Sequence, residues 1–227
     1  MKKNTPALIL ASLAGLCALA IAQPAKEDPK APKIEAAQPE MDEMTKQWMA
    51  LGNTNEHHAR FEAMVGVWDA TVTMFEPGKE PNVSKGTMVN RLIHGGRYLQ
   101  HNFKGEFMGM EFTGSGTFGY NNATGKYQGT WIDSMSTGTM VSEGTYDEAT
   151  KTYTSTGDMD GPGGMKITQR ETIKIISNDE HVMEMFHTMP GVPEIKAMEI
   201  KYTRKAPAEK KDKAEGKKPK AGAPAGN

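Results

Sequence analysis

From position 67 onward, apolar and polar residues alternate with a period of two, which is the pattern of half-buried β-strands. The first such segment places four apolar residues on one face, namely Trp68, Ala70, Val72 and Met74. Nine further segments of this kind follow, at 83–94, 97–104, 110–120, 126–133, 137–146, 151–159, 165–176, 181–188 and 194–204. Short turns such as Gly95-Gly96 join them, so the pattern predicts antiparallel neighbours.

Ten evenly spaced strands joined by hairpins would leave costly open edges unless the sheet closed on itself. The predicted fold is therefore all-β, a closed antiparallel barrel of about ten strands whose lumen could hold one small ligand. Gly66 and Trp68 on the first strand and Arg204 on the last resemble the set of residues that lipocalin-like (calycin) barrels use to close one end. The resemblance implies that the guanidinium lies over the indole.

In the segment before the predicted barrel, apolar residues recur with the periodicity of a helix. They do so from Met41 to Leu51, and Gly52-Asn53 ends this amphipathic helix. A second helical segment is predicted over 56–64. We expect both segments to pack as a lid across one mouth of the barrel.

The spacing of several motifs over about 41–205 resembles the bacterial family known as domain of unknown function 1579. The motifs that carry the resemblance are His58, Val65-Gly66-Val67-Trp68, Gly86, Arg91, Gly95-Gly96-Arg97, Gly119-Tyr120, Tyr127, Trp131-Ile132-Asp133-Ser134, Gly144, Arg170 and 196–204. Asn121 departs from the Asp expected after Tyr120, although it still permits an Asx turn. The resemblance implies a lipocalin-like barrel and brings no substrate with it.

Both ends of the chain differ in composition from the barrel segment. Residues 1–22 combine Lys2-Lys3 with an apolar run that ends in Ala20-Ile21-Ala22, the pattern of a signal peptide, so the mature chain is expected to begin at Gln23 without a membrane span. Residues 23–39 form a Pro- and Ala-rich linker, 40–205 the barrel domain with its helices, and 206–227 a basic tail predicted to be disordered. The protein is therefore expected to be exported, either periplasmic or secreted.

The charge distribution limits the possible partners. The chain carries −1 overall; Lys2 and Lys3 contribute +2 and the stretch from Lys205 contributes +4, which leaves −7 between them. An acidic body does not suit nucleic acid, whereas the tail could contact an anionic envelope or act only as a solubilising end. Cys17 is the only cysteine, so the mature chain is expected to have no disulfide and no thiolate nucleophile.

Recognised catalytic patterns are missing from the sequence. Gly114-Ser115-Gly116-Thr117-Phe118-Gly119 matches a dinucleotide fingerprint, but a turn and another strand follow it where that motif needs a helix. No Gly-x-Ser-x-Gly elbow or His-Glu-x-x-His zinc motif occurs. We therefore assign no catalytic residue, and the sequence does not identify a cofactor.

Several polar and aromatic residues could line the lumen. The candidate ligand-binding residues are Arg97, His101, Phe112, Phe118, Tyr120, Trp131, Asp133 and Arg170. An equally weighted alternative is that Asp133 pairs with Arg97 or Arg170 in a buried structural network.

Methionine is unusually frequent, with 17 residues. Met183, Met185 and His187 share one strand face, and thioether with imidazole ligands suits Cu(I). We favour the ordinary interpretation that methionine fills the core. Apart from the Cu(I) alternative, we predict no metal site.

Three function classes remain open on the sequence. The leading one is a protein that binds a small apolar or amphipathic molecule in its lumen. The alternatives are an enzyme using the same lumen, with Asp133, His101 or His187 as proton carriers, and a structural or interaction protein of the cell envelope with a filled barrel. We lean away from an enzyme because no polarising partner can be located.

Overall fold

The computed structural model describes residues 42–206. The expected signal peptide, the linker and nearly all of the basic tail lie outside these residues. Within the described part, the helices are α1 (Glu43–Leu51), α2 (Glu56–Ala59) and the 3-10 segments η1 (Arg60–Met64) and η2 (Pro162–Gly164). The strands are β1 (Gly66–Met74), β2 (Asn82–Ile93), β3 (Tyr98–Phe107), β4 (Met110–Asn121), β5 (Lys126–Asp133), β6 (Met140–Asp147), β7 (Thr152–Asp160), β8 (Lys166–Ser177), β9 (Glu180–Met189) and β10 (Val192–Arg204).

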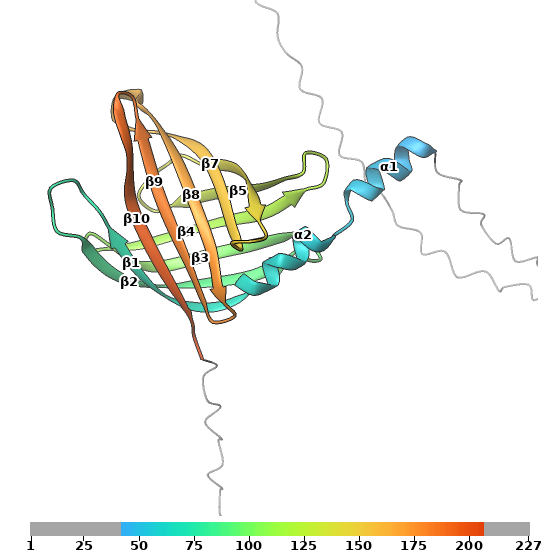
Figure 1. Ribbon diagram of the computed structural model, residues 1–227, viewed down its shortest axis with the longest axis horizontal. Helices are drawn as coiled ribbons and strands as arrows, with labels where there is room; N and C mark the ends of the chain where they lie inside the picture. Colours follow the sequence, from blue (N-terminus) through green and yellow to red (C-terminus); the bar gives the residue numbers. More distant parts are fainter. Residues whose placement is uncertain (1–41, 207–227) are drawn as a thin grey trace, which may run out of the picture. The chain divides into compact units, whose positions relative to one another are not determined.

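The strands form a closed antiparallel barrel (Figure 1). Each strand pairs with its neighbour in the sequence, and β1 also pairs with β10, so that no sheet edge remains. The predicted ten-stranded closed barrel is thus confirmed. Because the chain meanders, one end of the barrel carries the β2–β3, β4–β5, β6–β7 and β8–β9 turns, and the opposite end carries the remaining loops.

Aromatic side chains cover two glycines of the barrel wall. The ring of Phe103 lies where a side chain at Gly86 would be, since a Cβ there would come within 2.3 Å of the ring. Trp131 covers Gly114 in the same way, with a corresponding distance of 2.2 Å. A glycine paired with an aromatic ring therefore supplies both the curvature and the packing at these positions.

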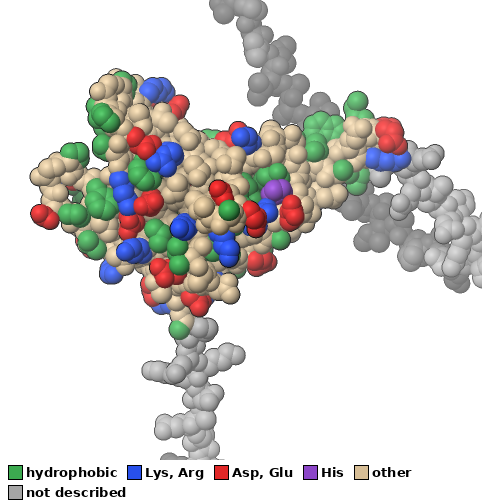
Figure 2. All heavy atoms as spheres, viewed as in Figure 1, with side chains coloured by type: hydrophobic (Ala, Val, Ile, Leu, Met, Phe, Trp, Pro, Cys, Tyr) green, Lys and Arg blue, Asp and Glu red, His purple; other side chains and the backbone are tan. Residues whose placement is uncertain are grey.

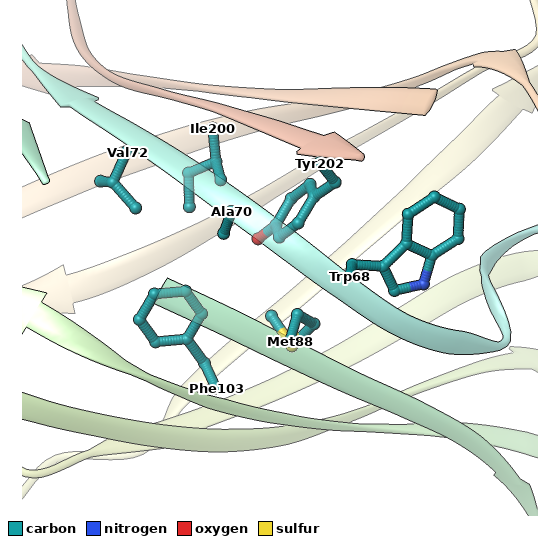
Figure 3. Close-up of a cluster of buried hydrophobic side chains, with 7 residues drawn as sticks. All are labelled: Trp68, Ala70, Val72, Met88, Phe103, Ile200 and Tyr202. Atoms are coloured by element: carbon teal, nitrogen blue, oxygen red, sulfur yellow. The ribbon is translucent and has the colours of Figure 1, made fainter. Parts of the chain in front are cut away.

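The end with the β2–β3 turn is closed by η1. Phe61 and Met64 are fully or almost fully buried and pack against Leu99, Phe118 and Tyr127 of the barrel. A second cluster surrounds Trp68 further along the barrel and joins side chains of β1, β2, β3 and β10 (Figure 3). Buried hydrophobic side chains therefore fill the closed end of the barrel and cover the inner side of one of its walls.

The expectation that both helical segments form a lid is wrong for α1. No residue of α1 is buried, Trp48 is 70% exposed, and hydrophobic side chains of this helix lie on the surface (Figure 2). The reason is geometric: the cap at Asn55 starts a new helix after a short turn, and Phe61 with Met64 already fills the barrel end. Only the C-terminal end of α1 is held, where Asn122 donates a hydrogen bond to the Leu51 carbonyl at 2.8 Å.

Arg204 joins the first strand, the last strand and the closing helix. Its guanidinium lies 4.1 Å from the centre of the Trp68 ring, and the two residues are direct partners between β1 and β10. It donates hydrogen bonds to the carbonyls of Val65 at 2.6 Å and Asn178 at 2.7 Å. Gly66 has φ of 130°, and a Cβ there would lie 2.6 Å from the guanidinium, so this position requires glycine.

Replacing Arg204 with Ala is expected to lower the free energy of unfolding by at least about 1 kcal/mol, because a cation–π contact and several hydrogen bonds are lost together. Urea denaturation measures this change. The matched control is Arg91→Ala, which removes an exposed arginine whose side chain, among the described residues, is bonded to Gln100 alone, and it is expected to change stability little. Equal unfolding midpoints for the two variants would contradict a closing role for Arg204.

Candidate functional site

The barrel encloses a cavity of about 1170 Å³. It extends from Met64 at the closed end to the β5–β6 loop and the ends of β3 and β7 at the other, which we call the mouth. This volume is sufficient for a small organic molecule.

Small side chains on one wall leave this space open. The inward positions of β5, β6 and β7 that line the cavity include Gly129, Ser142 and Ser155. The opposite wall, from β1 and β10, carries Val72, Ile200 and other buried side chains. The cavity therefore follows from an asymmetry in side-chain volume between the two walls.

The lining is mainly apolar and adaptable. Nine lining residues are methionines: Met64, Met74, Met88, Met135, Met140, Met159, Met183, Met185 and Met198. Six are aromatic: Phe103, Phe107, Phe112, Phe118, Trp131 and Tyr202. Flexible thioethers can repack around guests of different shape, while the rings offer flat apolar surface.

The tautomer of His101 follows from its hydrogen bonds. The Asn90 side chain donates from Nδ2 to the Met64 carbonyl at 3.0 Å, so its oxygen faces His101 Nδ1 at 3.1 Å. The proton of a neutral His101 must therefore be on Nδ1, which leaves Nε2 as an acceptor. Burial lowers the pKa of His101 to about 4, so the ring is neutral at pH 7.

His181 is held between two aromatic rings. It stacks on Tyr202 with ring centres 4.5 Å apart and meets Trp68 edge-on at 4.3 Å. Its Nδ1 is buried and has no hydrogen-bond partner among the described residues. Burial, together with the charges of Arg204 and His101, lowers the pKa of His181 to about 4. This imidazole is also neutral at pH 7.

Glu171 is an acidic residue of the cavity lining. It lies on β8 between Ser155 of β7 and Met185 of β9. Burial, and after it the charge of Glu171, raise the pKa of Tyr202. Among the described residues, no side chain or backbone group donates a hydrogen bond or forms an ion pair with its carboxyl group. Burial raises the pKa of Glu171 to about 7. A half-buried carboxyl group with a shifted pKa beside a cavity is a candidate for a functional site.

Gln169 and His187 lie beside Glu171. They are direct partners between β8 and β9, and His187 Nε2 is 3.3 Å from the Gln169 side-chain oxygen. Gln169 is buried, and burial lowers the pKa of His187. These side chains form the polar part of the cavity wall.

Among residues 42–206, no lysine or arginine lines the cavity. The acidic residues of its lining are Glu106, Asp133, Asp158, Asp160 and Glu171, of which Asp160 is paired with Lys166. Asp133 lies near the mouth, where it accepts hydrogen bonds from the Trp131 indole at 3.2 Å and the Met135 backbone at 2.8 Å. The cavity therefore has an excess of negative groups.

Of the residues expected to bind a ligand, five line the cavity: His101, Phe112, Phe118, Trp131 and Asp133. Tyr120 lies outside the lining, at the closed end, where it stacks on His57 with ring centres 4.0 Å apart. Ligand binding by the lining residues stays a prediction.

The placement of Arg97 and Arg170 in the lumen is wrong. Arg97 lies in the β2–β3 turn and donates a hydrogen bond to the Gly52 carbonyl at 2.7 Å. The Arg170 side chain lies on the opposite face of β8 from Gln169 and Glu171. On this outer face it donates two hydrogen bonds to the Glu194 carboxylate, at 2.9 and 2.6 Å. Neither pairs with Asp133, which is held by Trp131 and Met135.

Sequence reasoning missed Asn90, Gln169, Glu171 and His181. The available signal was that Gln169 and Glu171 share one face of β8 with Ile173 and Ile175. Two polar residues in register with apolar ones suggest an inward face with an embedded polar site.

Met183, Met185 and His187 all line the cavity. Among the described residues, no three His, Cys, Asp or Glu side chains are grouped so that they could hold a metal ion. Cu(I) binding by the thioethers, the alternative to the favoured interpretation of core filling, is not tested by these observations.

Residues 53–204 match the family described as "Protein of unknown function (DUF1579)". The chain belongs to this family. No curated protein matches the sequence. None of the helices in residues 42–206 combines the length and hydropathy needed to cross a membrane.

Two solved structures are similar to this chain. The crystal structure of Rv2717c from M. tuberculosis is 13% identical in sequence, with a TM-score of 0.53 over 68% of this chain and all of that one. The S-type phycobiliprotein lyase CPES from Guillardia theta is 12% identical, with a TM-score of 0.47 over 70% of this chain and 97% of that one. At these identities the first similarity shows the barrel fold alone.

Glu171 is expected to make stability depend on pH. Its folded pKa of about 7 lies above its ordinary value of 4.5, so between these values the folded state holds more protons and the contribution to stability falls as pH rises. Glu171→Gln should therefore match the unmodified protein near pH 4.5 and exceed its unfolding free energy by about 1 kcal/mol or more at pH 8.

Urea denaturation at both pH values tests this expectation. Glu180→Gln, at an exposed position on β9, is the control and should show no such pH-dependent gap. A constant difference between the Glu171 variant and the unmodified protein would contradict the assignment of a buried, unpaired carboxyl group.

Proposed function

We propose that this protein binds a small, partly apolar molecule in the lumen of its barrel. The observation that carries this proposal is the cavity of about 1170 Å³, which reaches from the closed end to the mouth. A barrel that served only as a structural element would gain stability by filling this space, because empty apolar volume costs packing energy. The cavity therefore favours a binding role over a filled structural barrel.

The lining suggests how a guest would be held. Methionine and phenylalanine side chains would contact its apolar body, and their flexibility would accommodate different shapes. Gln169, His187 and the acceptor nitrogen of His101 would contribute hydrogen bonds that orient a polar end. Because η1 blocks one end of the barrel, the guest would enter through the mouth.

An uncharged probe whose fluorescence rises in apolar surroundings, N-phenyl-1-naphthylamine, tests lumen binding directly. We expect saturable binding to the unmodified protein. Ser155→Phe should weaken it at least about tenfold, because the new ring would project from the open wall into the cavity.

Thr156→Phe is the matched control, since this residue follows Ser155 on β7, is exposed and points to the opposite face of the strand. It should leave probe affinity unchanged. Absence of probe binding to the unmodified protein, or equal binding by both phenylalanine variants, would overturn the proposal.

We further propose that the protein acts after export. The charged start, the apolar run and the Ala20-Ile21-Ala22 site support this compartment, and the basic tail would suit contact with an anionic envelope. Intact-mass analysis of the protein from its own cells should give a chain that begins at Gln23. A chain that retained residues before Gln23 would contradict cleavage at this site.

A further inference from the structure

We propose that the lumen selects an organic cation, an ammonium head group on an apolar body, and that Glu171 receives the head group. This inference rests on the proposed binding function and adds the chemical class of the ligand.

Among the described residues, no basic side chain pairs with Glu171 inside the barrel. Its lateral neighbours on β7 and β9 are Ser155 and Met185, and Gln169 lies two positions away on its own strand. The adjacent basic residue, Arg170, is bonded to Glu194 on the outer face. A carboxylate in this position would be stabilised by a cation that arrives with the guest.

The His101 ring is also suited to a hydrogen-bond donor, because it accepts through Nε2 while its Nδ1 proton is engaged by Asn90. An ammonium group brings three donors and no acceptor, whereas a carboxylate guest would bring only acceptors.

The charge and surface chemistry of the cavity agree with this choice. In the part of the chain that the structure describes, five acidic residues and no lysine or arginine line the cavity, so its potential favours cations over anions. Aromatic rings such as Phe103, Phe112 and Trp131 add faces on which a cation is stabilised. An anionic guest such as a fatty acid would meet repulsion at the mouth and at Glu171.

A series of head groups on one tail tests the proposal. Decylammonium, decanol and decanoate, each below its micelle concentration at pH 7.5, are titrated as displacers of N-phenyl-1-naphthylamine. We expect decylammonium to bind about tenfold more tightly than decanol, and decanoate to bind more weakly than decanol.

Glu171→Gln should remove most of the advantage of decylammonium over decanol. Saturable binding of N-phenyl-1-naphthylamine to the variant shows that it is folded. Glu180→Gln, an exposed acidic position on β9, should retain the full advantage. The ranking in the unmodified protein is a second measurement that does not depend on any variant.

The outcomes separate this inference from the proposed function. Decanoate binding as tightly as decylammonium, or an advantage that persists in Glu171→Gln, would overturn the cation selectivity and leave lumen binding in place. Failure of the probe and of all three displacers to bind would overturn lumen binding itself.

Discussion

The pairing of β1 with β10 is the constraint on which the rest of this structure depends. It removes both edges of a ten-stranded sheet and places Trp68 opposite Arg204. Arg204 then bonds to backbone carbonyls at the start of β1 and in the β8–β9 turn. Because Gly66 has no side chain, the guanidinium fits against the backbone there. Closure of the sheet and closure of the barrel end are therefore one set of contacts.

This closure also defines the cavity. η1 inserts Phe61 and Met64 into the end that Arg204 closes, and the carbonyl of Met64 accepts hydrogen bonds from both Trp68 and Asn90. Asn90 in turn sets the tautomer of His101. A structural contact at the closed end thus determines which atom of a cavity-lining imidazole can accept a hydrogen bond.

The polar groups of the lumen are costly to bury without partners. His181 and Glu171 both carry atoms that find no partner in the described residues, and burial shifts their pKa values toward the neutral forms. Natural cores rarely retain such groups where an apolar side chain would pack equally well. Their presence beside a cavity of this size is the physical basis for proposing a ligand with a polar, donating head group.

The ten strands and their closure could be predicted from the sequence. The prediction rested on strand periodicity, on turn residues and on the positions of Gly66, Trp68 and Arg204. These features are local or follow from the need to remove sheet edges. The sequence also pointed to His101, Trp131 and Asp133 as lumen residues. It did not determine which polar residues of β8 face inward, because a shift of one position exchanges the two faces and both faces of that strand carry polar and apolar side chains. Only the tertiary structure placed Arg170 outside and Glu171 inside, where neighbouring strands, and not the local pattern, set the direction of each side chain.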